Sequence, residues 1–236
     1  MSLHSRFLSH WTGKDFCDDD NKRLVQNKYV QRLRDTCQHG FYMQIGREEL
    51  CGVNRTTIRP DITRVCFSEI RLSQARRHAE LYGGLGIGVH RDFILGKEGN
   101  PVFYVQNSWK GHVVENFAVI HATAEELVRT LEEAGKNRDV ESVRNNIRDP
   151  LRHVMGYVKG MSDENRTELN YYDEMEWRVV DVTRLHGECM FRDENTEGVY
   201  RLKVTPPDIR LIVFPDKATR RFAIQDPLLR DYFNGN

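Results

Sequence analysis

Hydrophobic and polar positions alternate with two different periods along the chain, and the first elements they predict are a strand over Arg6–Thr12 and a helix over Lys28–Gln38. The strand is a short apolar run that ends at Gly13. The helix ends before Gly40, and its apolar side chains recur at helical spacing. These side chains are Tyr29, Val30, Leu33 and Cys37. The chain therefore opens as a strand, a loop and a helix.

A second strand and helix are predicted at Thr63–Phe67 and Leu72–Tyr82, followed by a glycine-rich run, Gly83–Gly88, and a strand over Pro101–Gln106. A dinucleotide fingerprint has its glycines between a strand and a helix. Here the glycines follow a helix and lead into strand-like residues. We therefore interpret them as a helix stop, a tight turn and a place of close strand packing.

The middle of the chain is predicted to be helical over residues 123–160, where Thr123 and Glu126 form a capping-box signature. Strands return near residues 176–182, 198–204 and 209–214, and a closing helix is predicted over Asp226–Phe233. Strands at both ends with helices between them predict a single α+β domain over residues 4–236. We expect a mixed or antiparallel sheet with flanking helices.

Composition narrows the class of protein. The charges of the 35 basic and 35 acidic side chains cancel, so the protein has no net electrostatic attraction to nucleic acid or to an anionic membrane. The five cysteines are odd in number and contain no C-x-x-C pair, which favours a reduced, cytoplasmic setting. No signal peptide is recognisable, and no apolar run approaches the ~20 residues of a membrane-spanning helix. We expect a cytoplasmic protein without membrane contact.

Histidines offer one candidate for chemistry near the N-terminus. The nine histidines contain no H-x-x-x-H or similar spacing, so no metal site is predicted. His10 and Thr12, however, alternate onto one side of the first predicted strand. An imidazole and a hydroxyl placed together could hydrogen-bond a ribose or a nicotinamide amide. A purely structural role for the pair is the simpler interpretation.

A second candidate lies in Tyr171–Val180, where Glu174 and Glu176 lead into a strand. In extended backbone these two carboxylates project to one side, while Trp177 and Val179 face the other. Such carboxylates could bind ribose hydroxyls, stabilise an oxocarbenium-like centre or transfer a proton. The alternative is an exposed acidic strand end paired with Arg178 or another cation.

Five blocks, taken in order, resemble the bacterial AbiGi family of abortive phage-resistance proteins, which are described as antitoxins. The order of the blocks is more specific than any one of them. The resemblance implies a role in phage defence, with a cognate toxin or another defence protein as partner. The blocks are Leu8–Gly13, Val65–Ser73, Tyr82–Gly88, Asn100–Tyr104 and Tyr172–Arg178.

A weaker resemblance, in order and residue type, is to ADP-ribosyltransferases, and it implies a similar fold and NAD as cofactor. His10 and Thr12 resemble the early polar strand of that family, and Val65–Ser68 with the following helix resembles its central segment. Glu174-Met175-Glu176 resembles its late glutamate motif.

The same resemblance implies a role for each matching residue. Glu176 would be catalytic and hold the nicotinamide ribose, and Glu174 would orient the acceptor substrate. His10 and Thr12 would position NAD, and Tyr82 would stack on it. Cys66 departs from the pattern, because a related Tyr-Phe-Ala segment would present a tyrosine there.

Three hypotheses about function follow. The first is a phage-defence protein with an NAD-binding or ADP-ribosyltransferase-like cleft, whose activity as an enzyme the sequence leaves open. The second is a non-catalytic antitoxin that binds a partner protein. The third, nucleic-acid binding, is weaker because the charge is balanced. It draws on the cations Arg71, Arg76, Arg77, Arg220 and Arg221. The sequence does not specify an oligomeric state.

Overall fold

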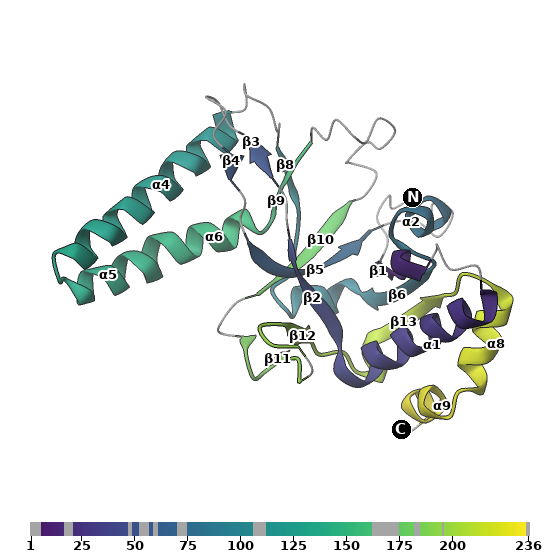
Figure 1. Ribbon diagram of the computed structural model, residues 1–236. Coiled ribbons are helices and arrows are strands. Elements are labelled where there is room, and N and C mark those ends of the chain that lie inside the picture. Colours follow the sequence, from purple (N-terminus) through teal and green to yellow (C-terminus); the bar gives the residue numbers. More distant parts are fainter. Residues whose placement is uncertain are drawn as a thin grey trace.

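An antiparallel sheet flanked by helices forms the centre of the protein (Figure 1). The computed structural model describes residues 6–16, 21–46, 49–51, 57–58, 61–69, 75–105, 112–161, 175–181, 185–194 and 196–234. Strands and helices are interspersed without a repeating βαβ order. The predicted α+β class is therefore confirmed.

The main sheet joins nine strands within the described residues, in the order β11-β12-β2-β5-β1-β6-β13, with β10 beside β5 and β7 beside β10. There are also two small two-stranded sheets among the described residues. In one, β3 (Leu50–Cys51) pairs with β4 (Thr57–Ile58) in antiparallel orientation. In the other, β8 (Phe103–Val105) pairs with β9 (Val158–Gly160) in parallel orientation. The strands of the main sheet are β1 (Phe7–Thr12), β2 (Phe41–Gly46), β5 (Ile62–Ser68), β6 (Leu85–His90), β7 (Asn100–Pro101), β10 (Glu176–Val180), β11 (Met190–Arg192), β12 (Tyr200–Leu202) and β13 (Ile209–Val213).

Helices cover both faces of the sheet, and in the part of the chain that the structure describes none of them is long and apolar enough to cross a bilayer. A π-helical turn, η4 (Arg144–Arg148), joins α5 to α6, and short 3-10 turns occur at η1 (Lys14–Phe16) and η6 (Pro206–Asp208). The helices are α1 (Lys22–His39), α2 (Ala75–Tyr82), α3 (Arg91–Leu95), α4 (His112–Glu133), α5 (Asn137–Val143), α6 (Asp149–Met155), α8 (Lys217–Gln225) and α9 (Pro227–Asn234).

The register of three adjacent strands defines the two faces of the sheet. Ser9 of β1 lies opposite Ser68 of β5, and Ser68 lies opposite Glu176 of β10. Directly opposed residues share a face, and successive residues of a strand alternate between faces. We call the face of Ser68 and Glu176 the β9 face. We call the other face, which carries Leu8 and Phe67, the α1 face.

Each face buries its own apolar core. On the α1 face, Leu8, Phe67 and Ile87 pack against Leu33 of α1 and Leu229 of α9. On the β9 face, a smaller cluster joins the sheet to β9 and to the bases of α4 and α6. It contains Leu50, Ile62, Val114, Ala118, Met155, Tyr157, Val158 and Val180. The sheet is therefore covered on both sides.

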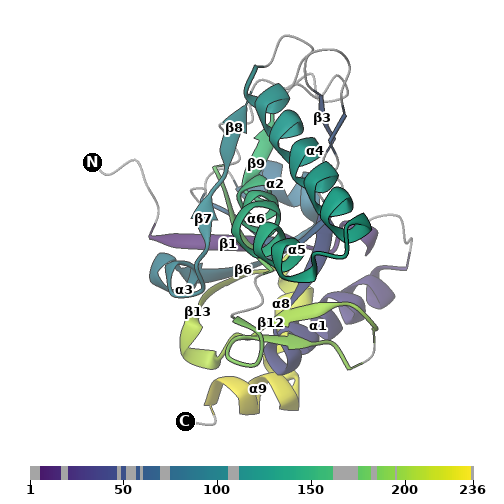
Figure 2. The same ribbon diagram turned by 90° about the vertical axis from the view of Figure 1, so that its left-hand side faces the viewer.

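The two ends of the described chain pack on one another, because α1 contacts both α8 and α9 (Figure 2). Arg34 of α1 forms an ion pair with Asp226, whose side chain is almost fully buried. Asp226 also accepts a hydrogen bond of 3.0 Å from the backbone of Leu229 and so caps α9. The hydrogen bond from Arg34 keeps the pKa of Asp226 below its usual value, despite its burial. This ion pair fastens the C-terminal helices to the N-terminal helix.

Most predicted elements are confirmed, but the start of the first helix and both ends of the predicted helical middle are wrong. The last of its helices ends at Met155, and Val158–Gly160, which were predicted to be helical, form β9. The first helix begins at Lys22 rather than Lys28, because Asn21 caps it by accepting a hydrogen bond of 3.1 Å from Leu24 N. The middle helix begins at His112 rather than at Thr123. The helix starts earlier because its buried apolar positions begin at Val114, and Thr123 is an exposed residue in the middle of the helix. Among the elements that were not predicted are helices α3 and α8 and strands β2 and β11.

Gly83 ends α2 as expected and occupies a conformation that only glycine adopts readily, with φ of 111°. A Cβ atom there would lie 2.3 Å from the carbonyl oxygen of Thr12 and 2.4 Å from the amide nitrogen of Lys14. Both contacts are with backbone atoms, which cannot rotate away. We therefore expect Gly83→Ala to lower the free energy of unfolding by about 2–4 kcal/mol, measured by chemical denaturation.

Gly135 provides the matched control, because it also has a positive φ, 69°, but a Cβ there would meet no atom within 4 Å. Gly135→Ala should cost only about 1–2 kcal/mol, from backbone strain alone. Equal losses for the two variants would show that the contact with β1 and η1 has no energetic weight.

Candidate functional site

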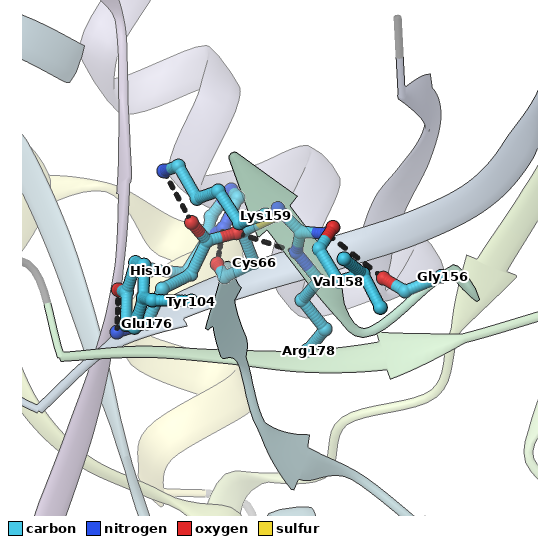
Figure 3. A network of polar contacts seen from close by, with 8 residues as sticks. All are labelled: His10, Cys66, Tyr104, Gly156, Val158, Lys159, Glu176 and Arg178. Carbon is cyan, nitrogen blue, oxygen red and sulfur yellow. Dashed lines mark hydrogen bonds and ion pairs between the residues drawn. The ribbon is translucent and has the colours of Figure 1, made fainter. Parts of the chain in front are cut away.

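Glu176, the predicted catalytic residue, begins β10 and is buried on the β9 face. Its carboxylate lies between two cations (Figure 3). Lys159 of β9 donates to Oε2 over 2.6 Å, and Arg178 donates through Nε to Oε1 over 2.7 Å. Both carboxylate oxygens are thus held by charge-assisted hydrogen bonds.

Arg178 is completely buried and connects β10 to the segment that enters β9. Its Nη1 donates to the carbonyl oxygens of Gly156, over 2.8 Å, and Val158, over 3.1 Å. A buried guanidinium needs partners for its N–H donors, and these contacts give partners to three of the five: two backbone oxygens and a carboxylate oxygen. The Glu176–Arg178–Lys159 network therefore holds β9 against the sheet.

The ionised form of Glu176 is strongly favoured. Burial by itself would raise the pKa of its carboxyl group, but the nearby charges of Arg178 and Lys159 and their hydrogen bonds outweigh burial. The pKa of Glu176 is consequently well below its usual value. A carboxylate in this state is a weak proton acceptor, and it would have to release an ion pair before it could bind a ribose hydroxyl.

Cys66 lies opposite Arg178 on β5, and burial is the main reason that the pKa of its thiol rises to about 12. The negative charge of Glu176 acts in the same direction. The thiol therefore stays protonated near neutral pH, which rules out a thiolate nucleophile at this position. Cys66 stands where the ADP-ribosyltransferase pattern presents a tyrosine, and its small side chain offers no ring for stacking.

His10 lies on the opposite face of the sheet. Ser9 lies opposite Ser68, and Ser68 lies opposite Glu176, so the Ser9 side chain is on the β9 face. His10 is the next residue of β1, and its side chain therefore points to the α1 face. Its ring contacts Phe41 and Phe67 edge-on, with centroid distances of 5.3 and 5.9 Å. These contacts embed the imidazole in the apolar core of the α1 face.

The environment of His10 explains its protonation state. Strand β2 pairs with β5 as far as Arg64, and β1 pairs with β5 at Ser68, so β1 and β2 diverge from one another along β5. Nδ1 of His10 lies 2.9 Å from the carbonyl oxygen of Cys66, in this fork. Burial lowers the pKa of His10, and this hydrogen bond opposes the shift only in part. A neutral ring that donates from Nδ1 fits these contacts.

Thr12 lies on the α1 face with His10, two residues along β1, but its hydroxyl is already engaged. Arg32 of α1 donates to Oγ1 over 2.8 Å and also pairs with Asp15 over 3.0 Å. The Arg32 guanidinium lies over the Phe16 ring, 4.9 Å from its centroid. A shallow, open pocket beside this cluster is lined by Asp15, Phe16, Lys28, Gln31, Arg32 and Asp35.

Tyr82 and Glu174 complete the predicted set. Tyr82 is half-buried at the end of α2, and its ring lies 5.9 Å from His78, which in turn lies 6.5 Å from Trp11. Since Trp11 projects from the β9 face, Tyr82 packs on that side of β1. Glu174 lies outside the described residues.

The structure thus brings His10 and Thr12 together on the α1 face, and it places Glu176 on the β9 face. The sheet separates His10 from Glu176, and Cys66 of β5 contacts both. Its backbone carbonyl oxygen lies next to the His10 ring, and its thiol lies beside the Glu176 carboxylate. Trp177 and Val179 alternate away from Glu176 as predicted. The predicted pairing of this strand end with Arg178 is confirmed, but the predicted exposure is wrong, because β9 covers the pair.

Sequence reasoning missed Lys159 and Tyr104, which approach Glu176 from the small parallel sheet. Lys159 and Tyr104 are direct partners across β8 and β9, and the Tyr104 hydroxyl accepts a hydrogen bond of 3.1 Å from Glu176 N. A short strand pairing over such a sequence separation leaves no local pattern. Among the described residues no group of three His, Cys, Asp or Glu side chains could hold a metal ion.

Comparison with known protein families identifies a match over most of the chain. The family model described as "Putative abortive phage resistance protein AbiGi, antitoxin" matches residues 40–215. No curated protein and no solved structure matches the chain. The matched segment contains β5, β6, β10 and the whole Glu176–Arg178–Lys159 network, and it covers most of the chain. The protein therefore belongs to the AbiGi family of abortive phage-resistance antitoxins.

Proposed function

We propose that this protein is the antitoxin of an abortive-infection pair and that it neutralises a cognate toxin by direct protein–protein binding in the bacterial cytoplasm. The family match over residues 40–215 carries this proposal. An antitoxin that acts by binding needs a stable scaffold and a partner-facing surface, and it needs no reactive side chain.

The chemistry around Glu176 supports binding rather than catalysis. Both oxygens of the carboxylate are occupied by Lys159 and Arg178, and the neighbouring Cys66 thiol is protonated. His10, the other half of the NAD hypothesis, faces the α1 core. These contacts are those of a buried structural network that fixes β9 and the helices attached to it.

Co-expression tests the proposal. The protein is produced together with the product of the neighbouring gene, which under this proposal arrests growth when it is expressed alone. We expect growth to be restored and the two proteins to elute as one complex in size-exclusion chromatography. Arrested growth with two separate elution peaks would refute the proposal.

The same purified protein distinguishes the NAD hypothesis, which assigns a cofactor site to His10, Thr12, Tyr82 and Glu176. Under our proposal, incubation with NAD releases no nicotinamide, and neutralisation does not depend on NAD. Release of nicotinamide that is lost in a folded Glu176→Gln variant would favour the transferase hypothesis instead.

A further inference from the structure

Helices α1 and α8 come from opposite ends of the chain and pack against one another in the structure (Figure 1). Together they contain eight lysines and arginines and one carboxylate residue, Asp35, whereas the charges of the whole chain cancel. Asp35 is engaged outside this helix pair, because it accepts a hydrogen bond of 2.6 Å from Arg201 of β12. The two helices therefore form a positively charged region that the overall balance of charge conceals.

Five of these eight cations are exposed to solvent. The other three are partly buried and have contacts of their own. Two of them form ion pairs, Arg32 with Asp15 and Arg34 with Asp226. We call the exposed set the basic face, and it consists of Lys22, Arg23, Lys217, Arg220 and Arg221.

Helix α8 directs its three cations away from the protein. Its buried positions are Thr219 and Ala223. At about 100° per residue, the three cations fall on the other side of the helix, around the exposed Ile224. Helix α8 contains no acidic residue, and the Asp216 carboxylate that precedes it accepts hydrogen bonds from Thr219. The outer face of α8 is therefore positively charged.

Helix α1 adds its exposed cations at the same end of the helix pair. Arg23 precedes Arg34 by about three helical turns, so both lie on one side of α1. From that side Arg34 reaches the end of α8. The start of α8 lies beside the first half of α1, since Gly84 donates to the Tyr29 hydroxyl over 3.2 Å and a Cβ on Gly84 would lie 2.6 Å from Pro215. Arg23 is thus close to the first turns of α8.

The chemistry of the basic face fits a polyanion with closely spaced charges. We propose that the basic face binds the phosphate backbone of a double-stranded nucleic acid, without reading its bases, as a second function that is independent of toxin binding. Arginine and lysine side chains supply the charge-assisted hydrogen bonds that phosphates accept. Arg220 and Arg221 of the nucleic-acid hypothesis thereby gain neighbours from the other end of the chain.

The same surface argues against two other polyanionic partners. Single strands bind by stacking their bases on exposed aromatic rings, but Tyr29 of α1 is buried and Phe222 of α8 packs against the core. A membrane-surface helix needs an apolar stripe opposite its charges, and the outer face of α8 has Ile224 as its one exposed apolar side chain.

Three aspartates oppose the attraction at the start of α1. Asp18, Asp19 and Asp20 precede this helix in the sequence and lie outside the described residues. Because they adjoin Lys22 and Arg23 in the chain, they lower the net charge there. We therefore expect α8 to contribute most of the binding, and replacing the three aspartates by asparagine should strengthen it.

Fluorescence anisotropy with a labelled DNA duplex of arbitrary sequence tests the proposal. We expect a Kd of roughly 1–10 µM in about 50 mM salt, the range of sequence-independent binding. If about three to five phosphates are contacted, raising the salt to about 200 mM should weaken binding roughly 40- to 500-fold. An RNA duplex of the same sequence shows whether the phosphates of both kinds of duplex are accepted.

Arg220 and Arg221 provide the test variant, and Lys136 and Arg138 provide the matched control. Replacing the first pair by glutamine should weaken binding at least about tenfold in 50 mM salt and make the salt dependence shallower by about two contacts. The second pair is equally exposed but lies where α4 meets α5, on the far side of the molecule from α8 (Figure 1). The same change there should alter the Kd by less than about twofold.

Stability separates a binding effect from misfolding. All four positions are exposed, so we expect Tm values within about 2 °C of wild type for both double variants. A loss of binding at an unchanged Tm then reports on the basic face itself.

The outcomes are distinct. Binding of either duplex with the expected salt dependence, lost in the Arg220 and Arg221 variant alone, supports the proposal. No binding by the wild-type chain in 50 mM salt, or equal binding by the two double variants, overturns it and leaves the antitoxin function standing. Binding to phosphatidylserine vesicles without binding to either duplex would show that the basic face docks on a membrane surface and that the proposal is wrong.

Discussion

Replacing Glu176 by glutamine is expected to lower the free energy of unfolding by about 3–5 kcal/mol, because it leaves the buried cations Arg178 and Lys159 without their counter-charge. For a chain of this size that loss corresponds to a fall in Tm of roughly 10 °C. Glutamine keeps the shape and one hydrogen-bond acceptor, so the effect reports on charge rather than on volume. Thermal unfolding followed by circular dichroism measures it.

Glu126 supplies the control for this experiment. It pairs with Arg129 over 2.7 Å, a geometry like that of Glu176 with Arg178, but both side chains are exposed. Glu126→Gln should therefore cost less than about 1 kcal/mol. Similar losses at the two positions would show that burial of the Glu176 network contributes nothing.

The pH dependence gives a second check on Glu176. Its pKa is lower in the folded chain than in the unfolded chain, so its ion pairs stabilise the fold fully above the unfolded value. This contribution is lost as pH falls below about 4.5. The difference in stability between wild type and Glu176→Gln should consequently narrow on acidification. A difference that stays constant down to pH 3 would contradict the assigned ion pairs.

A chain restricted to residues 40–215, the segment that matches the AbiGi family, is expected not to fold. It lacks β1, which lies in the middle of the sheet and pairs with β6 through all six of its residues. It also lacks the fully buried Leu8 and the nearly buried Trp11, each worth about 2–5 kcal/mol. Together with the lost strand pairing, these contributions approach or exceed the whole stability of a typical domain, about 5–15 kcal/mol.

Heteronuclear NMR or a denaturation curve would test this expectation. A chain of residues 6–234 keeps every described element, so both this chain and the full chain should unfold cooperatively. The 40–215 segment should show poorly dispersed resonances and no cooperative transition. A cooperative transition for that segment would mean that β5 and β6 close the sheet without β1.

The individual elements around the site could be predicted from the sequence because their signals are local. The alternation of Glu176 with Trp177 and Val179 placed these side chains on the correct sides of β10. Gly83 was interpreted correctly as a helix stop, since few residues tolerate its backbone conformation.

The relation between the elements could not be predicted, because it depends on register and on long-range pairing. His10 and Glu176 were both placed correctly in strands, but the pairing of Ser9 with Ser68 decides that they lie on opposite faces. A register shifted by one residue would have put them on the same face. The burial of Glu176 follows likewise from Lys159, which reaches it from a parallel pair of short strands.

The start of α4 was predicted wrongly for a different reason. Thr123 and Glu126 satisfy a capping box by spacing alone, yet the helix continues through them. Apolar positions on both sides of Thr123, from Val114 to Val128, make the longer helix more stable than a new start.

The central place of β1 also affects the order in which the protein can assemble during synthesis. β1 is made before its neighbours β5 and β6, which follow about 55 and 80 residues later, and Asp226, which anchors α1 through Arg34, follows β1 by more than 200 residues. At about 5–20 residues per second, the nascent chain carries an unpaired central strand for several seconds or longer. The central strand therefore finds its partners only well after its own synthesis, once β5 and β6 have emerged from the ribosome.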